Sequence, residues 1–478
     1  MNRRTKIVAT VGPASESPEK ITALIKAGVN VFRLNLSHGE IGNHIDVANR
    51  IRHQAKELDS QVGILADLQG PKIRIAQFKN GSVNLKQGNN FTLNLNLADN
   101  AGTETEVGLD YPQLLNYVEC GDTLLLDDGR LQLEVKSVDN PAVHCEVIIG
   151  GTLGSRKGIN KRGGGLAAPA LTEKDIEDIV ALAELKPDFV AVSFVLSEHD
   201  IHETRRRLQD SNISPAIIAK IERAEVVADD AILDKILEHA DGIMVARGDL
   251  GVEVGDAELI GIQKHLIRRA RQMNRVVITA TQMMESMISS SMPTRAEVFD
   301  VANAVLDGTD AVMLSAETAV GSYPVEVVSA MSTTCLGAER HPTARTSRYR
   351  VEHQFSSAEE SIAMAAIYAA NHYGDVKCIA SLTESGRTPL LMSRLSSGLP
   401  IYALSRRPVT LRKLCLCRGV IPLFFDPEEK NDAEIQQQVL DFLKQDQNFN
   451  TGDSILMTRG EVMGSPGNTN VLKILKIP

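Results

Sequence analysis

The segment at residues 217–223 decides the fold, and it reads Ile-Ile-Ala-Lys-Ile-Glu-Arg. Its apolar, β-branched residues predict a short buried strand that ends in charged residues. Because side chains in a strand alternate between two faces, Lys220 and Glu222 should point in the same direction. A cation and an anion on one face at the end of a buried strand favour a ligand at that point, and the alternative is a plain salt bridge.

Two further segments repeat this pattern. Residues 242–249 read Gly-Ile-Met-Val-Ala-Arg-Gly-Asp, and residues 276–281 end in Thr-Ala-Thr. Strands with polar residues at their C-terminal tips are typical of a (β/α)₈ barrel. With residues 216–222 counted as one strand, the apolar runs that complete the barrel are residues 6–11, 29–36, 62–67, 189–194 and 311–315.

Helix signals lie between these strands. Ser17 is an expected N-cap, Pro18 follows it in the first turn, and Gly28 should end that helix. Residues 172–175 read Thr-Glu-Lys-Asp and resemble a capping box with Asp in place of Glu. The apolar residues that follow at helical spacing are Ile176, Ile179, Val180 and Ala183.

The pattern of apolar residues changes after residue 71, where the apolar runs become short and alternate with polar residues. No long helical period appears until about residue 166, which predicts a small all-β domain inserted after the third barrel strand. Gly163, Gly164 and Gly165 mark the return of the chain and could form a hinge or only a flexible linker. We expect barrel segments at residues 1–70 and 168–341 and the inserted domain at 71–167.

Residues 342–478 predict a separate α/β domain. A helix at residues 356–372 should open with Ser356 and Glu359 as a capping pair. Its long apolar stretch, residues 358–370, could serve either an interface or the core. The strands that follow are expected at residues 376–382, 401–404, 420–425, 454–457 and 471–475.

Composition narrows the function classes. The 478 residues carry a net charge of −10, from 51 basic and 61 acidic side chains, and 43% of them are hydrophobic. This balance fits a globular protein and argues against nucleic acid or an anionic membrane as partner. The six cysteines contain no CxxC pair, which favours a reducing cytoplasm. Cys415 and Cys417 are expected to be buried packing residues and not zinc ligands. There is no leader-like start and no long apolar run, so we expect a soluble protein that is not exported.

Polar residues gather at the C-terminal ends of the strands, which all open onto one face of a barrel. Glu222 and Asp249 offer oxygen ligands of the kind that Mg²⁺ or Mn²⁺ prefers. Arg33 and Lys220 suit a phosphoryl group, and Gly248 lets the backbone approach an anion closely. This composition favours phosphoryl transfer. The full set of tip residues is Arg33, Asn35, Ser37, Asp67, Lys220, Glu222, Arg247, Gly248, Asp249, Thr281, Ser315 and Glu317.

Several motifs resemble those of the pyruvate kinase family, in order along the whole chain. They are Val-Phe-Arg-Leu-Asn-Leu-Ser-His-Gly at 31–39, Asp-Leu-Gln-Gly-Pro-Lys-Ile-Arg at 67–74, Lys-Ile-Glu at 220–222, Met-Val-Ala-Arg-Gly-Asp-Leu-Gly-Val-Glu at 244–253, Thr-Ala-Thr-Gln-Met-Met-Glu-Ser at 279–286, Pro-Thr-Arg-Ala-Glu at 293–297 and Met-Leu-Ser-Ala-Glu-Thr at 313–318. The resemblance implies a TIM barrel with an inserted small β-barrel lid and a C-terminal α/β regulatory domain. It also implies the last step of glycolysis, in which phosphoenolpyruvate and ADP give pyruvate and ATP, in a cytoplasmic homotetramer.

The same resemblance implies a role for each matching residue. Lys220 would stabilise the transferring phosphoryl group and Arg33 would hold it, with Glu222 and Asp249 as ligands of Mg²⁺ or Mn²⁺. The amides of Gly248 and Asp249, with Thr281, would hold the substrate carboxylate. The remaining roles are nucleotide binding by Arg74 and Lys157 and enolate protonation by a relay near Thr281, Ser315 and Glu317, with the proton donor itself left open.

One departure from the family concerns K⁺. Many members need K⁺ and carry Thr-Lys-Gly-Pro-Glu after the Asp of the third strand, whereas this chain has Leu-Gln-Gly-Pro-Lys, residues 68–72. Lys72 could supply the positive charge that K⁺ supplies elsewhere, so we expect K⁺ to be dispensable; the alternative is that Lys72 only pairs with Asp67. The K⁺ ligands, if the site is used, would be Asn35, Ser37, Asp67 and Leu68.

A second expectation concerns regulation. Thr383, Glu384, Ser385, Gly386, Arg387 and Thr388 join a strand to a helix. Hydroxyls and free helix amides suit an anion, and the family places a phosphorylated effector here; the alternative is a capping turn. Asp446, in the region 444–447, would repel the second phosphate of fructose 1,6-bisphosphate. We therefore expect AMP or a sugar monophosphate, as in the bacterial subgroup with Lys in place of Glu.

Two rival functions stay open at this point. Another phosphoenolpyruvate or pyruvate barrel, such as a class II aldolase or a lyase, would use Mg²⁺ and an Arg but would not need an inserted domain with Arg74 and Lys157. A metabolite sensor without turnover would be expected to lack Lys220 or a metal-binding carboxylate, and both are present.

Overall fold

The computed structural model describes residues 3–109, 111–166, 168–346, 350, 352–427, 431–446, 449–461 and 467–478. Its centre is a closed barrel of parallel strands in the order β1-β16-β15-β14-β13-β12-β3-β2, which confirms the predicted TIM barrel. The strands are β1 (Lys6–Thr10), β2 (Val31–Asn35), β3 (Gly63–Asp67), β12 (Phe189–Val192), β13 (Ala216–Ile221), β14 (Gly242–Ala246), β15 (Val276–Ala280) and β16 (Ala311–Leu314).

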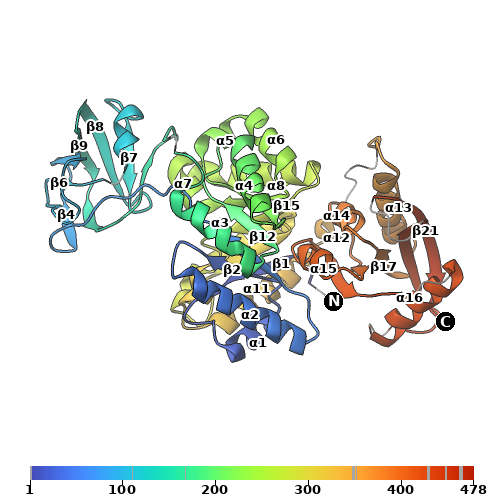
Figure 1. The fold of residues 1–478 in the computed structure, drawn as a ribbon. Helices are drawn as coiled ribbons and strands as arrows, with labels where there is room; N and C mark the ends of the chain where they lie inside the picture. The colour runs from blue at the N-terminus through green and yellow to red at the C-terminus, as the bar shows by residue number, and fades with distance from the viewer. Residues whose placement is uncertain are drawn as a thin grey trace.

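Helices surround the barrel and cover its apolar outer face (Figure 1). The main ones are α1 (Pro18–Ala27), α2 (Ile41–Glu57), α3 (Glu173–Leu185), α4 (Glu198–Asp210), α5 (Ala224–Ala228), α6 (Asp230–His239), α7 (Arg247–Val254), α8 (Asp256–Gln272), α9 (Arg295–Asp307) and α11 (Pro324–Glu339). Shorter turns are η2 (Glu285–Ile288), α10 (Ala316–Ala319) and α12 (Pro342–Arg345).

The predicted helix ends agree with the structure, but one predicted buried face does not. Ser17 caps α1, Gly28 ends it at a φ of 114°, and Thr172 forms a capping box with Asp175 at the start of α3. Val180, however, is 65% exposed, and α3 buries Leu182 and Leu185 together with Ile179. The core-facing stripe of α3 therefore lies on a face next to the one that the apolar spacing indicated.

The inserted β domain stands at one end of the molecule, apart from the barrel (Figure 1). One sheet has the order β11-β7-β8-β9-β5-β6, and a second pairs β10 with β4. Its buried residues, including Phe91 and Leu126, form a core of their own. The elements are β4 (Ser82–Leu85), β5 (Asn90–Asn94), β6 (Glu106–Val107), η1 (Pro112–Asn116), β7 (Thr123–Leu126), β8 (Leu131–Asp139), β9 (Ala142–Ile149), β10 (Gly151–Gly154) and β11 (Ile159–Lys161).

The glycine triplet at the return of the chain is anchored to the barrel. The amide of Gly163 donates to the carbonyl of Glu253 at 2.9 Å, and the amide of Gly165 donates to the Glu225 carboxylate. At Gly164, where φ is +83°, a Cβ would lie 2.4 Å from Glu225 Oε2, so the position needs glycine. These contacts describe a defined crossing point and not a loose linker.

The C-terminal domain is a sheet in the order β19-β18-β17-β20-β21, in which β21 is antiparallel. The predicted cap of its first helix is wrong by one residue, because Ser357 and not Ser356 accepts the capping bond from the amide of Glu360. The strands are β17 (Val376–Leu382), β18 (Ile401–Ser405), β19 (Val420–Phe424), β20 (Ser454–Gly460) and β21 (Thr469–Lys476). The helices are α13 (Ala358–His372), α14 (Arg387–Ser393), α15 (Pro408–Leu414) and α16 (Asp432–Asp446).

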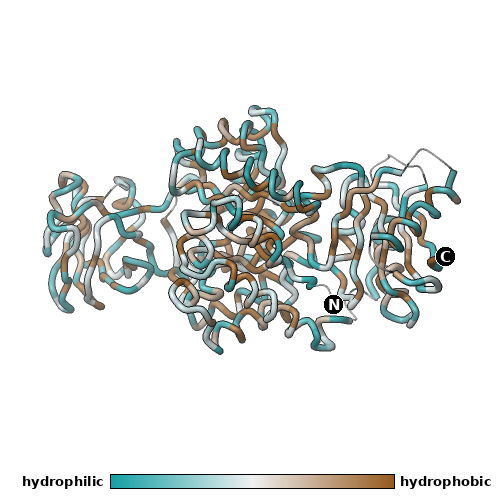
Figure 2. Tube along the Cα trace, turned by 90° about the horizontal axis from the view of Figure 1, so that it is seen from below, coloured by the Kyte–Doolittle hydropathy of each residue, from teal (hydrophilic) through white to brown (hydrophobic). Residues whose placement is uncertain are grey.

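The C-terminal domain covers the end of the barrel at which the strands begin. Residues inside the barrel, such as Val8 and Met244, belong to one contiguous apolar core with Ala366 of α13 and Leu456 of β20. Figure 2 shows hydrophobic segments concentrated in the centre of the barrel. Cys415 and Cys417 are buried in the same shared core, as expected for packing residues.

Buried ion pairs fasten this interface. Arg394, which has no solvent exposure, donates from Nη1 to Asp310 Oδ2 at 2.8 Å and from Nη2 to the other carboxylate oxygen. Arg412 pairs with Asp188 at 2.7 Å. Both aspartates come directly before barrel strands, so the fastening lies at the strand beginnings. Among the residues that the structure describes, no helix is long and apolar enough to cross a membrane.

We predict that Arg394→Ala destabilises the protein strongly. Asp310 would keep its buried charge without its cation, and breaking a buried pair in this way costs about 3–5 kcal/mol. Urea titrations followed by circular dichroism would measure the loss. Arg206→Ala on α4, an exposed arginine that pairs with Glu203, should leave the free energy of unfolding nearly unchanged. Equal, small effects of the two substitutions would contradict the role of the Arg394 pair.

Candidate active site

The centre of the candidate site is Lys220, near the C-terminal end of β13. Its Nζ lies 3.1 Å from Glu222 Oε1 and 3.3 Å from Asp67 Oδ1, and it donates to the Ser193 hydroxyl at 2.7 Å. Burial alone would lower the pKa of Lys220, but the carboxylates of Asp67 and Glu222 raise it above its ordinary value. Lys220 is therefore a fixed cation at the end of the barrel where the strands finish, which we call the barrel mouth.

Arg33 extends from β2 into the same network. Its Nε donates to Asp67 Oδ2 at 2.6 Å, and its Nη1 donates to the Thr10 hydroxyl at 3.1 Å. Burial would raise the pKa of Asp67, but Lys220 and Arg33 together hold it below its ordinary value. Asp67 thus stays ionised and orients two cations side by side, which is an arrangement that can bind a phosphoryl group.

Glu222 and Asp249 are the carboxylates that could hold a divalent ion. Burial raises the pKa of Glu222, and the negative charge of Asp249 raises it further, against the effect of Lys220. Two close carboxylates with substrate oxygens form the ligand type that Mg²⁺ accepts. Among the described residues there is no group of three or more His, Cys, Asp and Glu side chains that could hold a metal. The donor set therefore fits Mg²⁺ only as a partial site that substrate would complete.

Lys72 contacts Asp249 from the edge of the inserted β domain. Its Nζ lies 2.9 Å from Asp249 Oδ1 and 3.6 Å from Asp128 Oδ1. Burial would lower the pKa of Lys72, but these two aspartates raise it. The alternative that Lys72 pairs with Asp67 is wrong, because the partners of Asp67 are Arg33 and Lys220.

Gly248 and Asp249 lie in the first turn of α7, where backbone amides lack intrahelical acceptors. The amide of Gly248 donates to the Thr281 hydroxyl at 2.8 Å. Thr281 follows β15 and has a φ of +69°, an uncommon conformation for a β-branched residue. Arg247 fixes it: its Nη2 donates to the Thr281 carbonyl at 2.7 Å, while Nη1 donates to Asp300 at 2.7 Å. The structure thus brings Gly248, Asp249 and Thr281 together. The expectation that Arg247 belongs to the mouth is wrong, because its side chain is buried and positions Thr281.

Ser315 and Glu317 follow β16. Glu317 Oε2 accepts from the amide of Ser315 at 2.6 Å, and Oε1 accepts from the amide of Met284 at 3.3 Å. Burial raises the pKa of Glu317, although both amides favour the ionised form. This carboxyl group connects the loops after β15 and β16, next to Thr281.

The residues proposed for K⁺ lie at the ends of β2 and β3. Asn35 and Asp67 face each other in the strand register, and Asn35 Oδ1 accepts from the amide of Ser37 at 3.3 Å. The side chain of Leu68 is buried, and its carbonyl accepts from the Ser193 hydroxyl at 2.7 Å. The set offers oxygen atoms, but Leu68 can contribute only a carbonyl.

Arg74 and Lys157 lie in the inserted β domain and contact other residues of that domain. Arg74 Nη1 donates to the Arg156 carbonyl at 3.0 Å, and Lys157 Nζ pairs with Asp127 at 2.7 Å. The charge of Arg74 acts to lower the pKa of Lys72, so Arg74 lies near the Lys72–Asp249 pair, whereas Lys157 pairs with Asp127 inside the inserted domain.

The expected effector loop joins β17 to α14 in the C-terminal domain. Glu384 pairs with Arg406 at 3.3 Å and with Arg407 at 2.5 Å, and the amide of Gly386 donates to the Thr383 hydroxyl at 2.9 Å. The hydroxyl of Ser385 accepts from the amide of Arg387 at 3.4 Å, and Thr388 donates to Glu359 at 2.7 Å. The side chain of Asp446 and residue Gln447 lie outside the described residues.

Two residues of the mouth were missed from sequence. Ser193 holds Lys220, and Thr10 holds Arg33. Both residues lie at the C-terminal ends of predicted strands, 189–194 and 6–11, so the rule that identified the other tip residues could have found them. Their hydroxyl groups are small and uncharged, so neither residue stands out in the sequence.

Two models of protein families match the chain and together cover most of it. Residues 2–328 match the family model described as "Pyruvate kinase, barrel domain", and residues 360–475 match the one described as "Pyruvate kinase, alpha/beta domain". "Pyruvate kinase" of Haemophilus influenzae is 55% identical over 458 residues, 96% of each chain. "Pyruvate kinase II" of Salmonella typhimurium is 52% identical over 475 residues, 99% of each chain. "Pyruvate kinase" of Geobacillus stearothermophilus is 40% identical over 99% of this chain and 80% of its own length.

Proposed function

This chain belongs to the pyruvate kinase family, and from that premise we propose that its barrel mouth transfers the phosphoryl group of phosphoenolpyruvate to ADP, the last step of glycolysis. The observation that carries the proposal is the Arg33–Asp67–Lys220 network, in which one ionised aspartate orients two cations. Such a pair can neutralise a phosphoryl group during its transfer, which is most of what catalysis of this reaction requires.

Lys220 acts on the phosphoryl group because its other contacts fix it. Asp67, Glu222 and Ser193 hold the ammonium group from the barrel side, so little reorganisation is needed when substrate charge shifts. Arg33, aligned by Asp67 and Thr10, holds the phosphoryl oxygens beside it. Glu222 and Asp249 would hold Mg²⁺, which when bound supplies additional charge neutralisation.

The substrate carboxylate is assigned to the first turn of α7. The amides of Gly248 and Asp249 and the Thr281 hydroxyl lie together there, and the helix terminus favours an anion. Protonation of the enolate is assigned to a relay of Thr281, Ser315 and Glu317. Burial raises the pKa of the Glu317 carboxyl, which favours the protonated form that such a relay needs.

Nucleotide binding is assigned to Arg74 and Lys157 of the inserted β domain. Their present partners, a backbone carbonyl and Asp127, can be exchanged for ADP phosphates when the domain closes on the barrel. The crossing point at Gly163–Gly165, with three positive φ values, is where we expect the rotation. An inserted domain that brings nucleotide to a barrel mouth favours a kinase over an aldolase or a lyase.

The family relationship also supports a homotetramer in the cytoplasm. All six cysteines are free thiols, which is consistent with a reducing compartment. The apolar face of α13 packs into the shared core through Ala363 and Ala366, so an interface would have to use its other side, where Tyr368 is 50% exposed.

We predict that Lys220→Ala lowers kcat for ADP-dependent pyruvate formation by at least about 100-fold with a small change in KM, because its contact is strongest in the transition state. A coupled pyruvate assay measures the rate. Mn²⁺ binding, followed by electron paramagnetic resonance, should be nearly unchanged and also reports that the variant is folded. Lys235→Ala on α6 is the matched control. Retained turnover in Lys220→Ala would contradict the assignment.

We predict that K⁺ is dispensable because Lys72 places a fixed ammonium group beside Asp249. The rate measured in sodium-free tetramethylammonium buffer should change little when K⁺ is added. Lys72→Glu should lose activity in that buffer and regain part of it with K⁺. Lys79→Glu, in the same domain, controls for charge reversal. Large K⁺ activation of the unmodified enzyme would exclude the idea.

We further propose that a monophosphate activator, such as AMP, ribose 5-phosphate or glucose 6-phosphate, binds the loop of residues 383–388. Its hydroxyls, with Arg387, Arg406 and Arg407 nearby, support an anion site. Titration at subsaturating phosphoenolpyruvate should show activation by a monophosphate and a weaker response to fructose 1,6-bisphosphate. Ser385→Glu should abolish the activation, while Ser361→Ala on α13 should preserve it. Strong preference for the bisphosphate would defeat this proposal.

A further inference from the structure

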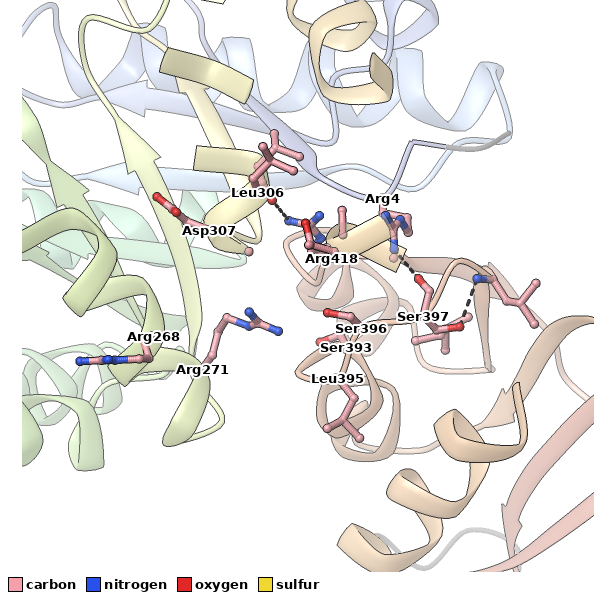
Figure 3. Close-up of a pocket in the computed structure, with 17 residues that line it drawn as sticks. Arg4, Arg268, Arg271, Leu306, Asp307, Ser393, Leu395, Ser396, Ser397 and Arg418 are labelled. Atoms are coloured by element: carbon pink, nitrogen blue, oxygen red, sulfur yellow. Dashed lines mark hydrogen bonds between the residues drawn. The ribbon is translucent and has the colours of Figure 1, made fainter. Parts of the chain in front are cut away.

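A polar cavity lies between the barrel and the C-terminal domain (Figure 3), at the end of the barrel opposite the mouth. Its volume is about 320 Å³, within the size range of small-molecule pockets. The walls come from Arg4 before β1, the ends of α8 and α9, α12 (Pro342–Arg345), the end of α14 with the segment that leads into β18, and Arg418 before β19. The cavity shares no residue with the barrel mouth or with the effector loop.

The lining is strongly basic. Arg4, Arg268, Arg271 and Arg418 line the cavity, and Asp307 is the one carboxylate among its described lining residues. Asp307 is already engaged, because Lys264 pairs with it and Gln263 Nε2 donates to it at 3.4 Å. Figure 3 shows Arg271 extending toward the segment that carries Ser393 and Ser396, whereas Arg268 extends away from it. The relevant cations are therefore Arg4, Arg271 and Arg418.

Backbone carbonyls accept from these guanidinium groups, and buried carboxylates lie close to Arg4 and Arg418. Arg418 Nη1 donates to the carbonyls of Val305 at 2.8 Å and Thr309 at 3.0 Å. Arg4 donates to the carbonyls of Ser397 and Glu339, and its nearest carboxylate contact is Nε to Glu339 at 3.8 Å. Burial, and then the nearby charge of Arg418, lowers the pKa of Arg4 to about 10. Four arginines against one carboxylate among the described lining residues make the cavity wall basic, which favours an anionic ligand.

The position of Arg271 is prepared by a glycine. At Gly308, where φ is +94°, a Cβ would lie only 2.3 Å from Arg271 Nη1, so glycine leaves the space that the guanidinium group occupies. Arg271 Nη2 also donates to the Arg394 carbonyl at 2.9 Å. The side chain thus crosses from the barrel to the C-terminal domain with a defined direction.

The opposite wall offers hydroxyl and apolar groups. Ser396 is half-buried, and its hydroxyl makes no hydrogen bond to any residue that the structure describes. Ser393 lies one turn earlier in the chain. Leu306, Leu395 and Leu399 line the remainder of the cavity. This mixture can hold a charged head group with a short organic part.

We propose that this cavity binds a small phosphate monoester between Arg4, Arg271 and Arg418, with Ser396 as an additional hydrogen-bond donor. Phosphate suits the site because guanidinium forks match its oxygens in pairs and its two charges offset several cations. The leucines would contact the organic part. Such a ligand would contact the barrel through Arg271 and the C-terminal domain through Arg418 and Ser396, and would therefore join the two.

The test is isothermal titration of glycerol 3-phosphate into the full chain, at constant ionic strength in chloride buffer. The Ser385→Glu background removes any contribution of the effector loop. We expect one binding event per chain that disappears in Ser396→Asp, which adds a carboxylate to the cavity, and persists in Ser396→Ala. Arg271→Gln should weaken binding by about tenfold, whereas Arg206→Gln on the exposed face of α4 should not change it. Circular dichroism melting confirms that each variant is folded.

Each of the following outcomes would overturn the proposal. The first is equal binding by the Ser396→Asp and Ser396→Ala variants, and the second is no change in Arg271→Gln. A third is equal affinity for succinate, which would remove the preference for phosphate. A fourth is equal affinity for inorganic phosphate, which would remove any contribution of the organic part. Crystals soaked in glycerol 3-phosphate should show phosphate density between Arg4, Arg271 and Arg418, and an empty cavity in such crystals would equally contradict the assignment.

Discussion

Asp67 holds two cations at one point of the barrel, and the rest of the mouth depends on that contact. Arg33 and Lys220 carry like charges and would repel each other in a buried site without it. Because the carboxylate is buried and contacts both cations, it remains ionised and holds the two side chains near each other. Glu222 contacts Lys220 directly, and Asp249 in the first turn of α7 contacts Lys72 beside them.

The barrel and most of its mouth could be predicted because the signals are local. Each apolar run that ends in a polar residue became a strand with ends within two residues of the expected positions, and parallel strands place those ends on one face. The partner of Lys72 could not be predicted, since Asp249 is distant in sequence and the contact depends on how the inserted domain lies. Arg247 was misplaced at the mouth for a similar reason: only packing shows that it turns back to the Thr281 carbonyl.

The contacts between the barrel and the C-terminal domain could not be predicted from the sequence either. The Arg394–Asp310 and Arg412–Asp188 pairs join residues from separate domains, and no spacing rule connects them. The exposed Val180 on α3 shows the same limit on a smaller scale. Its apolar character fits the helical stripe, but the position of neighbouring helices selects Leu182 and Leu185 for burial instead.

The shared core below the barrel has a consequence for how the molecule comes apart. The interior of the barrel and one face of the C-terminal sheet form a single apolar cluster, while the inserted β domain has a cluster of its own. Segments that share a core open cooperatively, and those with separate cores open independently. Amide protons of the C-terminal sheet should then exchange with solvent at rates similar to those of the barrel strands. Amide protons of the inserted domain should exchange at different rates. The inserted domain can in this way open repeatedly while the base of the barrel stays closed.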